Sequence, residues 1–334
     1  MKPRWRTVSW LHKPVIALLA AMLPASIQAA RAQDYPSRPI TIIVPLVAGG
    51  SVDVVARALA DRMKTTLGQP IVVENIPTAA GTLGVARVAQ SAPDGYTIGM
   101  GDQTTNIVSS LMNPVRYDVL KDFEPIALLS TSPVALVARK TLPAADVKQL
   151  VGWLREQPEG GTAGSFGQGS GPHIIGAAFQ HLTGAKLRMI VYRGSPLALQ
   201  DIVGDQIDML FIEQSNMVSH HRGGTIKAHA VLATKRSAAV PDVPTIEEAG
   251  GPPLHVMTWR GMWLPKGTPA HIVGKLHAAV IEALADPAVQ KRITEVGQEL
   301  VPREQQTGES LAAHHKAEME KWTAMIKAAG IKTD

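Results

Sequence analysis

Apolar and polar positions alternate along the chain in blocks that predict strands and helices in turn. The apolar run over 40–44 predicts a buried strand, and apolar residues at helical spacing over 52–67 predict a helix that stops at Gly68. The pattern continues with a strand over 71–73, a helix over 84–90 and a strand over 96–100. This βαβαβ order predicts a parallel sheet with right-handed crossovers.

The pattern restarts in the second half of the chain. Strand-like runs over 126–129 and 134–138 leave the first block, and a run over 259–264 returns to it. Between them the pattern predicts helices over 147–155, 174–182 and 196–203, and strands over 187–191, 207–212 and 228–233. The tail over 269–329 is predicted to be helical, with breaks at Asp286-Pro287 and near Pro302.

We therefore predict an α/β protein of two lobes, each a mainly parallel sheet flanked by helices, with extended crossovers joining them. Lobe I is predicted to hold residues 33–133 and 258–334, and lobe II residues 134–257. In open α/β sheets the ligand site lies at the carboxyl ends of the strands. A cleft between the two lobes is accordingly the predicted site.

The first 32 residues have the features of a cleavable secretory signal. Basic residues stand near the start, and the apolar stretch over 14–23 is short for a membrane span. Ala30-Arg31-Ala32 matches the small-x-small cleavage pattern, which predicts a mature chain that begins at Gln33 in the periplasm. An uncleaved anchor is the less favoured alternative, because the apolar stretch is short.

Charge and cysteine content narrow the classes of function. The formal net charge of the full chain is +5, but the signal holds five Lys or Arg and no Asp or Glu, so the remaining 302 residues have a net charge of 0. That balance argues against a nucleic-acid partner. With no cysteine, disulfides and attachment of a lipid through cysteine are excluded.

Two glycine-rich loops each precede a predicted helix. The first covers 45–53 after the first strand, and the second covers 164–173. A helix start has backbone N–H groups without partners and a partial positive charge, and glycine lets a ligand approach them. Two such starts facing each other would bind an anion, most simply a small carboxylate.

The candidate ligand-binding residues lie in these loops or directly after strands. They are Val47, Ala48, Gly49, Ser51, Asp53, Thr104, Thr105, Ser165, Phe166, Gly169, Ser170, His173, Tyr192, Ser195 and Glu213. Structural alternatives stay open for several of them. Ser51 would serve equally as a helix cap, Asp53 as a partner of the helix dipole, and Glu213 as a surface acid.

Catalytic and cofactor motifs are absent from the sequence. It has no G-x-S-x-G elbow, no P-loop and no dinucleotide fingerprint, so we expect neither an enzyme nor a bound cofactor or metal. Two alternatives to a transport receptor remain. One is a receptor that signals to a membrane sensor, and the less favoured one is an exported hydrolase that uses Ser170 and His173.

Several motifs resemble those of one known family. They include Tyr35-Pro36-Ser37-Arg38-Pro39, Gly167-Gln168-Gly169-Ser170 and Tyr192-Arg193-Gly194-Ser195, with others over 44–57, 68–75, 93–97, 121–126, 241–250 and 265–269. In this order they resemble the periplasmic substrate-binding proteins of tripartite tricarboxylate transporters, often called Bug receptors.

The resemblance implies two α/β lobes, a closing cleft and a carboxylate held partly through waters at the first loop. It also implies membrane transporter subunits as partners, and we expect a monomer. Two positions depart from the family pattern, because Leu46 and Ala48 stand where an aromatic residue and a second proline are usual. These changes alter the pocket wall, so the resemblance does not fix which carboxylate binds.

Overall fold

The computed structural model describes residues 35–77 and 81–331, and those from Arg38 onward form one compact unit. The signal predicted over residues 1–32 lies outside the described residues. The strands are β1 (Ile40–Val44), β2 (Ile71–Asn75), β3 (Thr97–Asp102), β4 (Phe123–Arg139), β5 (Gly161–Ser165), β6 (Leu187–Val191), β7 (Met209–Glu213), β8 (Ile226–Val231), β9 (Met257–Pro265) and β10 (Glu299–Leu300).

The helices confirm the predicted α/β class. They are α1 (Ser51–Leu67), α2 (Thr82–Ala89), the π-helix η2 (Thr104–Val108), α3 (Ser109–Met112), α4 (Val147–Glu156), α5 (Gly171–Thr183), α6 (Ser195–Val203), α7 (Gln214–Arg222), α8 (Ala270–Ala285), α9 (Pro287–Glu295), the 3-10 turn η3 (Arg303–Gln305) and α10 (Gly308–Ala328). Across 35–77 and 81–331, no helix is both long and apolar enough to cross a membrane.

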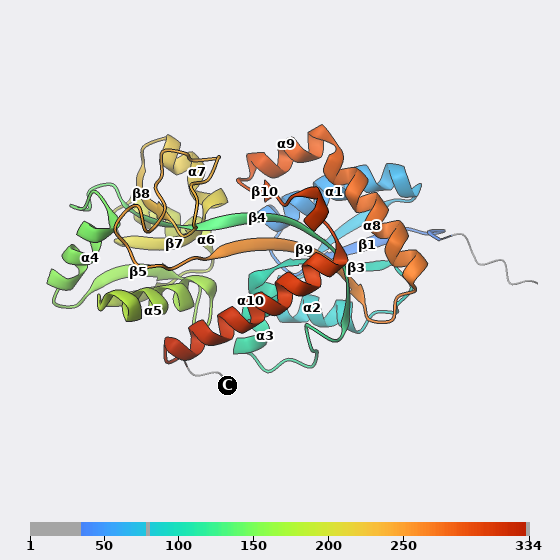
Figure 1. Ribbon diagram of the computed structural model, residues 1–334, viewed down its shortest axis with the longest axis horizontal. Coiled ribbons are helices and arrows are strands. Elements are labelled where there is room, and N and C mark those ends of the chain that lie inside the picture. The colour runs from blue at the N-terminus through green and yellow to red at the C-terminus, as the bar shows by residue number, and fades with distance from the viewer. Residues whose placement is uncertain (1–34, 78–80, 332–334) are drawn as a thin grey trace, which may run out of the picture. The chain divides into compact units, whose positions relative to one another are not determined.

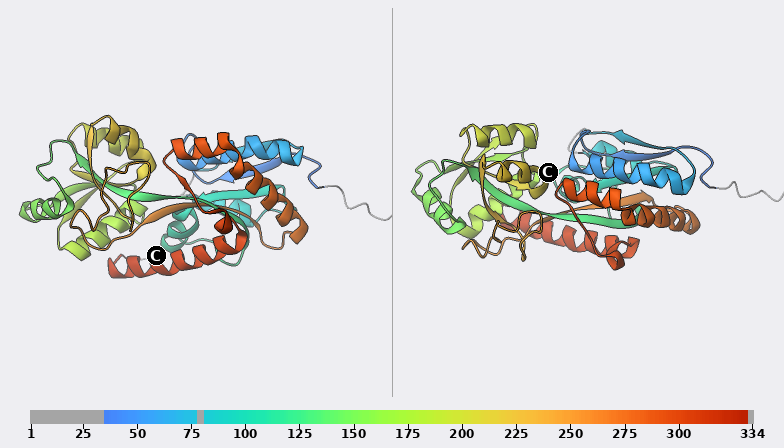
Figure 2. Two further views of the ribbon diagram at one scale, coloured as in Figure 1. Left: turned by 45° about the horizontal axis from the view of Figure 1, so that its top comes forward. Right: turned by 90° about the horizontal axis from the view of Figure 1, so that it is seen from above.

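Two long strands run through the centre of the fold (Figure 1). The sheet order is β2-β1-β3-β9-β4-β7-β5-β6, and β8 and β10 also pair with β4. β1, β2 and β3 are parallel and form the sheet of the first lobe, while β5, β6 and β7 are parallel and form that of the second. β4 and β9 are the extended crossovers, and the further views show β4 passing through both groups of strands (Figure 2).

The strand pairings turn the carboxyl ends of the two parallel sheets toward each other. β3 is antiparallel to β9, β9 to β4, and β4 to β7, so β3 and β7 run in opposite directions. β3 ends at Asp102, which pairs with Arg260 and through it with Ser130 of β4. β7 ends at Glu213, which pairs with Val134 of β4. The two ends are therefore four residues apart along β4, about 13 Å at the usual rise per residue.

Local sequence explains where the main helices begin and end. Gly68 adopts the left-handed conformation with φ of 68° and stops α1, as the sequence predicts. Asp286 ends α8 and caps α9 by accepting a hydrogen bond from the N–H of Ala288, with Pro287 in the first turn. The predicted break at Asp286-Pro287 is thus confirmed.

Several elements differ from the sequence prediction. The runs over 126–129 and 134–138 are parts of one strand, β4, rather than two. Pro133 is the last residue of β4 that pairs with β9, and pairing with β7 begins at Val134, so the missing N–H of Pro133 is tolerated at this change of partner. β5 was missed because its sequence, GTAGS, has weak strand propensity. A Cβ at Gly164 would lie 2.8 Å from Leu210 Cδ1, so that side chain would have to shift to accept a larger residue.

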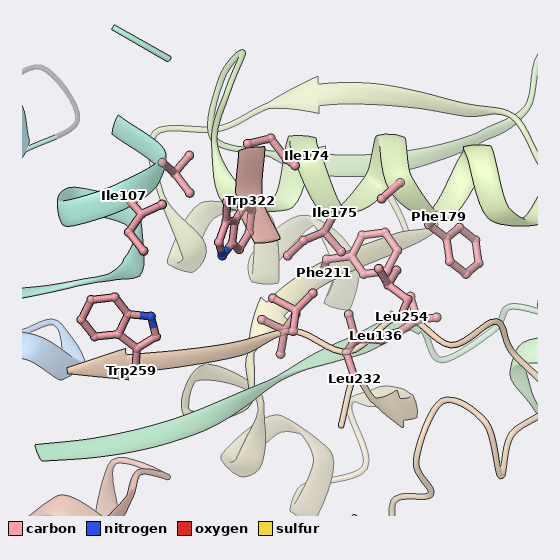
Figure 3. Close-up of a cluster of buried hydrophobic side chains, with 14 of the residues drawn as sticks. Ile107, Leu136, Ile174, Ile175, Phe179, Phe211, Leu232, Leu254, Trp259 and Trp322 are labelled. Atoms are coloured by element: carbon pink, nitrogen blue, oxygen red, sulfur yellow. The ribbon is translucent and has the colours of Figure 1, made fainter. Parts of the chain in front are cut away.

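A hydrophobic cluster connects both lobes under the long C-terminal helix. It includes Ile107 from the first lobe, Phe179 and Phe211 from the second, and Trp259 of β9 (Figure 3). Trp322 of α10 is fully buried in this cluster. The core therefore fixes the crossover strands, and with them the facing strand ends. The lobe boundaries at residues 133/134 and 257/258 stay a prediction.

Candidate functional site

Several buried polar atoms without a hydrogen-bond partner belong to residues at or near the strand ends. Within the described residues they include Gln103 Oε1 after β3, Ser165 Oγ at the end of β5, Ser215 Oγ after β7 and Arg260 Nε on β9. Buried polar groups in folded proteins normally have hydrogen-bond partners, so an unpaired one is unusual. A polar ligand bound between the strand ends would supply these partners.

Arg260 connects the two sides of this region. Its side chain is fully buried, and its Nη2 donates to Ser51 Oγ at 2.8 Å and to Glu213 Oε1 and Oε2 at 2.6 and 2.8 Å. Ser51 is the first residue of α1, and Glu213 is the last residue of β7. One guanidinium therefore joins the helix start of the first lobe to a strand end of the second. Gln298 Nε2 also donates to Glu213 Oε1.

Asp102 adds a second acid beside Arg260. It is the strand partner of Arg260, and burial raises its pKa, although Arg260 and the N–H of Thr105 act in the opposite direction. Burial by itself would lower the pKa of Arg260, but the carboxylates of Glu213 and Asp102 raise it. The guanidinium is therefore a permanent cation inside the fold.

The first glycine loop is held by Asp53. The Asp53 carboxylate accepts hydrogen bonds from the Gly49 N–H at 2.8 Å, from Arg57 Nε at 3.0 Å and from Asn75 Nδ2 at 3.0 Å. Burial would raise the pKa of Asp53, but the bonds from Arg57, Gly49 and Asn75 together lower it. Asp53 therefore acts as a brace for the loop.

The donors of this loop differ from those that the sequence suggested. The Gly49 N–H donates a hydrogen bond to the Asp53 carboxylate, and the Gly50 N–H donates one to the Val47 carbonyl. The cap of α1 is Gly50, so the alternative in which Ser51 caps the helix is wrong. The N–H groups that α1 offers are those of its own first turn, which begins at Ser51. Val47 and Ala48 are exposed at the loop tip.

The second glycine loop is folded on itself and lies against the first lobe. Ser170 Oγ accepts from the Phe166 N–H, and His173 Nδ1 accepts from the Gly169 N–H, both at 3.1 Å. A Cβ at Gly169 would lie 2.8 Å from Met112, so only glycine fits this approach. Ser170 and His173 thus bond separate backbone groups, which does not match the arrangement of a nucleophile and its base.

A cavity of about 430 Å³ adjoins this loop. Its lining residues are Ser165, Gln168, His173, Met189, Val191, Gly330 and Ile331. Because His173 Nδ1 accepts a hydrogen bond, the proton of the neutral ring is on Nε2, and burial lowers the pKa of this side chain. The volume is within the usual range for small-molecule sites, roughly 300–1,000 Å³.

Four other predicted residues lie apart from this group or are occupied elsewhere. The Tyr192 hydroxyl donates to Asp201 of α6 at 2.7 Å, and burial with this bond raises the pKa of Tyr192 to about 12. Ser195 begins α6. Thr105 is fully buried and its hydroxyl bonds to Asp102 and Asn106, while Thr104 begins the π-helix η2. A ligand-binding role stays a prediction for these four, as it does for the other predicted residues.

Comparison with known proteins identifies the family of this chain. Residues 55–331 match the family model described as tripartite tricarboxylate transporter family receptor, TctC. The chain belongs to this family. A UPF0065 protein of Agrobacterium vitis is 35% identical over 326 residues, which cover 97% of this chain and 93% of that protein. The fold is that of the periplasmic substrate-binding proteins of the Bug type.

Three solved structures show the same architecture. The periplasmic binding protein BugD is 35% identical with a TM-score of 0.80, over 90% of this chain and 100% of BugD. MatC from Rhodopseudomonas palustris, with bound malate, is 36% identical with a TM-score of 0.79, and the match covers 87% of this chain and 100% of MatC. A second R. palustris protein, with adipate, is 29% identical with a TM-score of 0.80, and the match covers 89% of this chain and 99% of that protein.

Sequence analysis of this TctC-family chain missed Arg260, Gln103 and Gln298. Arg260 had a usable signal, because it is the one charged residue in the apolar run of β9, and a charge there requires a buried partner. Gln103 and Gln298 had no such signal. Their position depends on which strands pair, and the sequence does not specify that pairing residue by residue.

The brace at the first loop generates a prediction on stability. Asp53→Asn should lower the free energy of unfolding near neutral pH by about 1–3 kcal/mol, because it removes a carboxylate that accepts three hydrogen bonds. The pKa of Asp53 is lowered in the fold, so its contribution is complete above about pH 4 and is lost as the pH falls further. Urea unfolding across this range measures it. Asp61→Asn, on the exposed side of α1, is the control, and equal losses in both variants would contradict the brace.

Proposed function

We propose that this chain is an extracytoplasmic receptor that binds a small carboxylate between its lobes and delivers it to a tripartite tricarboxylate-type membrane transporter. The observation that carries the proposal is that Arg260 joins Ser51, the first residue of α1, to Glu213 at the end of β7, where the carboxyl ends of the two parallel sheets face each other. Helix starts and strand ends of this kind bind anions.

The relatives support the carboxylate as the ligand class. MatC has malate bound and a second R. palustris protein has adipate, and both share this fold over most of the chain. The family name supports a transporter as the partner. The receptor is proposed to act as a monomer in the periplasm and to have no enzymatic activity.

Ligand binding should raise the melting temperature. A ligand that binds only the folded state adds about 2.7 kcal/mol of stability at a hundredfold excess over its dissociation constant. Thermal unfolding with a panel of aliphatic and aromatic mono- and dicarboxylates is the measurement. A shift with sugars or cationic amino acids, and none with any carboxylate, would overturn the assignment.

Both helix starts should contribute to affinity. Ser51→Ala and Ser170→Ala each remove a hydroxyl at the start of α1 or α5, and each should weaken carboxylate binding by about ten- to a hundredfold, the effect of losing a hydrogen bond to a charged group. Calorimetry measures the affinities. The control is Ser219→Ala on the exposed side of α7. If both variants bind like the control, the ligand lies elsewhere.

Export should remove the first 32 residues. In a Gram-negative host we expect the secreted protein to begin at Gln33, because Ala30-Arg31-Ala32 matches the cleavage pattern. Intact-mass measurement of the periplasmic fraction tests this. A full-length chain found in the membrane fraction would refute it.

A further inference from the structure

The base of the proposed cleft holds one buried cation and its counter-ion. Arg260 is 0% exposed, and Glu213, its partner, is 13% exposed. Both oxygens of Glu213 bind the same Nη2 that also binds Ser51 at the start of α1. The Glu213 carboxylate therefore lies beside the helix start at which the proposed function places the ligand.

The charges of the ion pair itself are balanced. Arg260 contributes one positive charge and Glu213 one negative charge, and Asp102, the strand partner of Arg260, adds no cation. His173, by the second loop, is favoured in its neutral form, because burial lowers its pKa. A ligand thus meets the partial positive charges of the two helix starts but no uncompensated side-chain cation among these residues.

Glu213 still has room to accept a hydrogen bond. Its Oε1 accepts from Arg260 and Gln298, whereas Oε2 accepts from Arg260 alone. A carboxylate oxygen accepts two hydrogen bonds, so one site on Oε2 is left for a donor. A second ligand carboxylate placed there would face a like charge, and this repulsion would weaken its binding.

We propose that the pair Arg260–Glu213 selects the charge of the ligand. The cleft takes a carboxylate with one negative charge, bound at a helix start, whose other end is a neutral hydrogen-bond donor such as an amide or hydroxyl that faces Glu213. A dicarboxylate of the same length binds more weakly. This inference rests on the proposed function, since it assigns the ligand of the same cleft.

Four proteins vary the charge at this point with little change of shape. The pair has a formal charge of 0 in the natural chain, +1 in Glu213→Gln, −1 in Arg260→Gln and 0 again in the double variant. Glu247→Gln is the matched control, because Glu247 also pairs with a basic side chain, His255, but at the surface. Circular dichroism checks folding, and the double variant keeps the test valid if a single variant fails to fold.

The probes are succinate, glutarate and adipate, each compared with its own monoamide by calorimetry. We expect the natural chain to bind a monoamide about tenfold or more tightly than the matching diacid. Glu213→Gln should change this ratio by about tenfold or more in favour of the diacid. Arg260→Gln should increase the preference for the monoamide. The double variant and the control should keep the ratio of the natural chain.

The outcomes separate two failures. Binding with the same ratio in all proteins, or a natural preference for the diacid, overturns the inference and leaves the proposed function intact. If no diacid or monoamide binds any of the proteins, the inference fails, and the proposed function fails with it only if the full panel of aliphatic and aromatic carboxylates also gives no thermal shift. A purely structural role of the pair would weaken both probes equally and leave their ratio unchanged.

Discussion

The antiparallel pairing of β4 with β9 is the constraint on which the rest of the structure depends. Together with the antiparallel pairings of β3 with β9 and of β4 with β7, it reverses strand direction between the two parallel sheets, so the carboxyl ends of β3 and β7 face each other across four residues of β4. Helices that follow parallel strands begin at those ends. These pairings therefore turn the starts of α1 and α5 and the end of β7 toward the same region.

That arrangement buries the charged guanidinium of Arg260, which is unfavourable unless the guanidinium has a partner. A buried guanidinium is tolerated only with a partner, and Arg260 has Glu213 at 2.6 Å and Asp102 as its strand neighbour. The same guanidinium bonds Ser51. The chemistry of the proposed cleft is thus built from two lobes and a crossover strand, and each part contributes at least one member of the network.

The glycines of the two loops serve different purposes. Gly49 adopts a φ of 82° and gives its N–H to Asp53, so its role is to shape the turn. Gly169 lies where a Cβ would meet Met112, so its role is to let the second loop approach the first lobe. The same residue type that suggested two anion sites from sequence is thus used for conformation in one loop and for contact in the other.

The sequence by itself determined the α/β class, the order of most elements and the helix stop at Gly68, because hydrophobic periodicity and capping are local properties. Motifs also sufficed to indicate the family. Only the tertiary structure decided that 126–129 and 134–138 form one strand, that Gly50 caps α1, and that Arg260 meets Glu213 and Ser51. These facts depend on contacts between residues far apart in sequence, and strand pairing, not local propensity, sets such contacts.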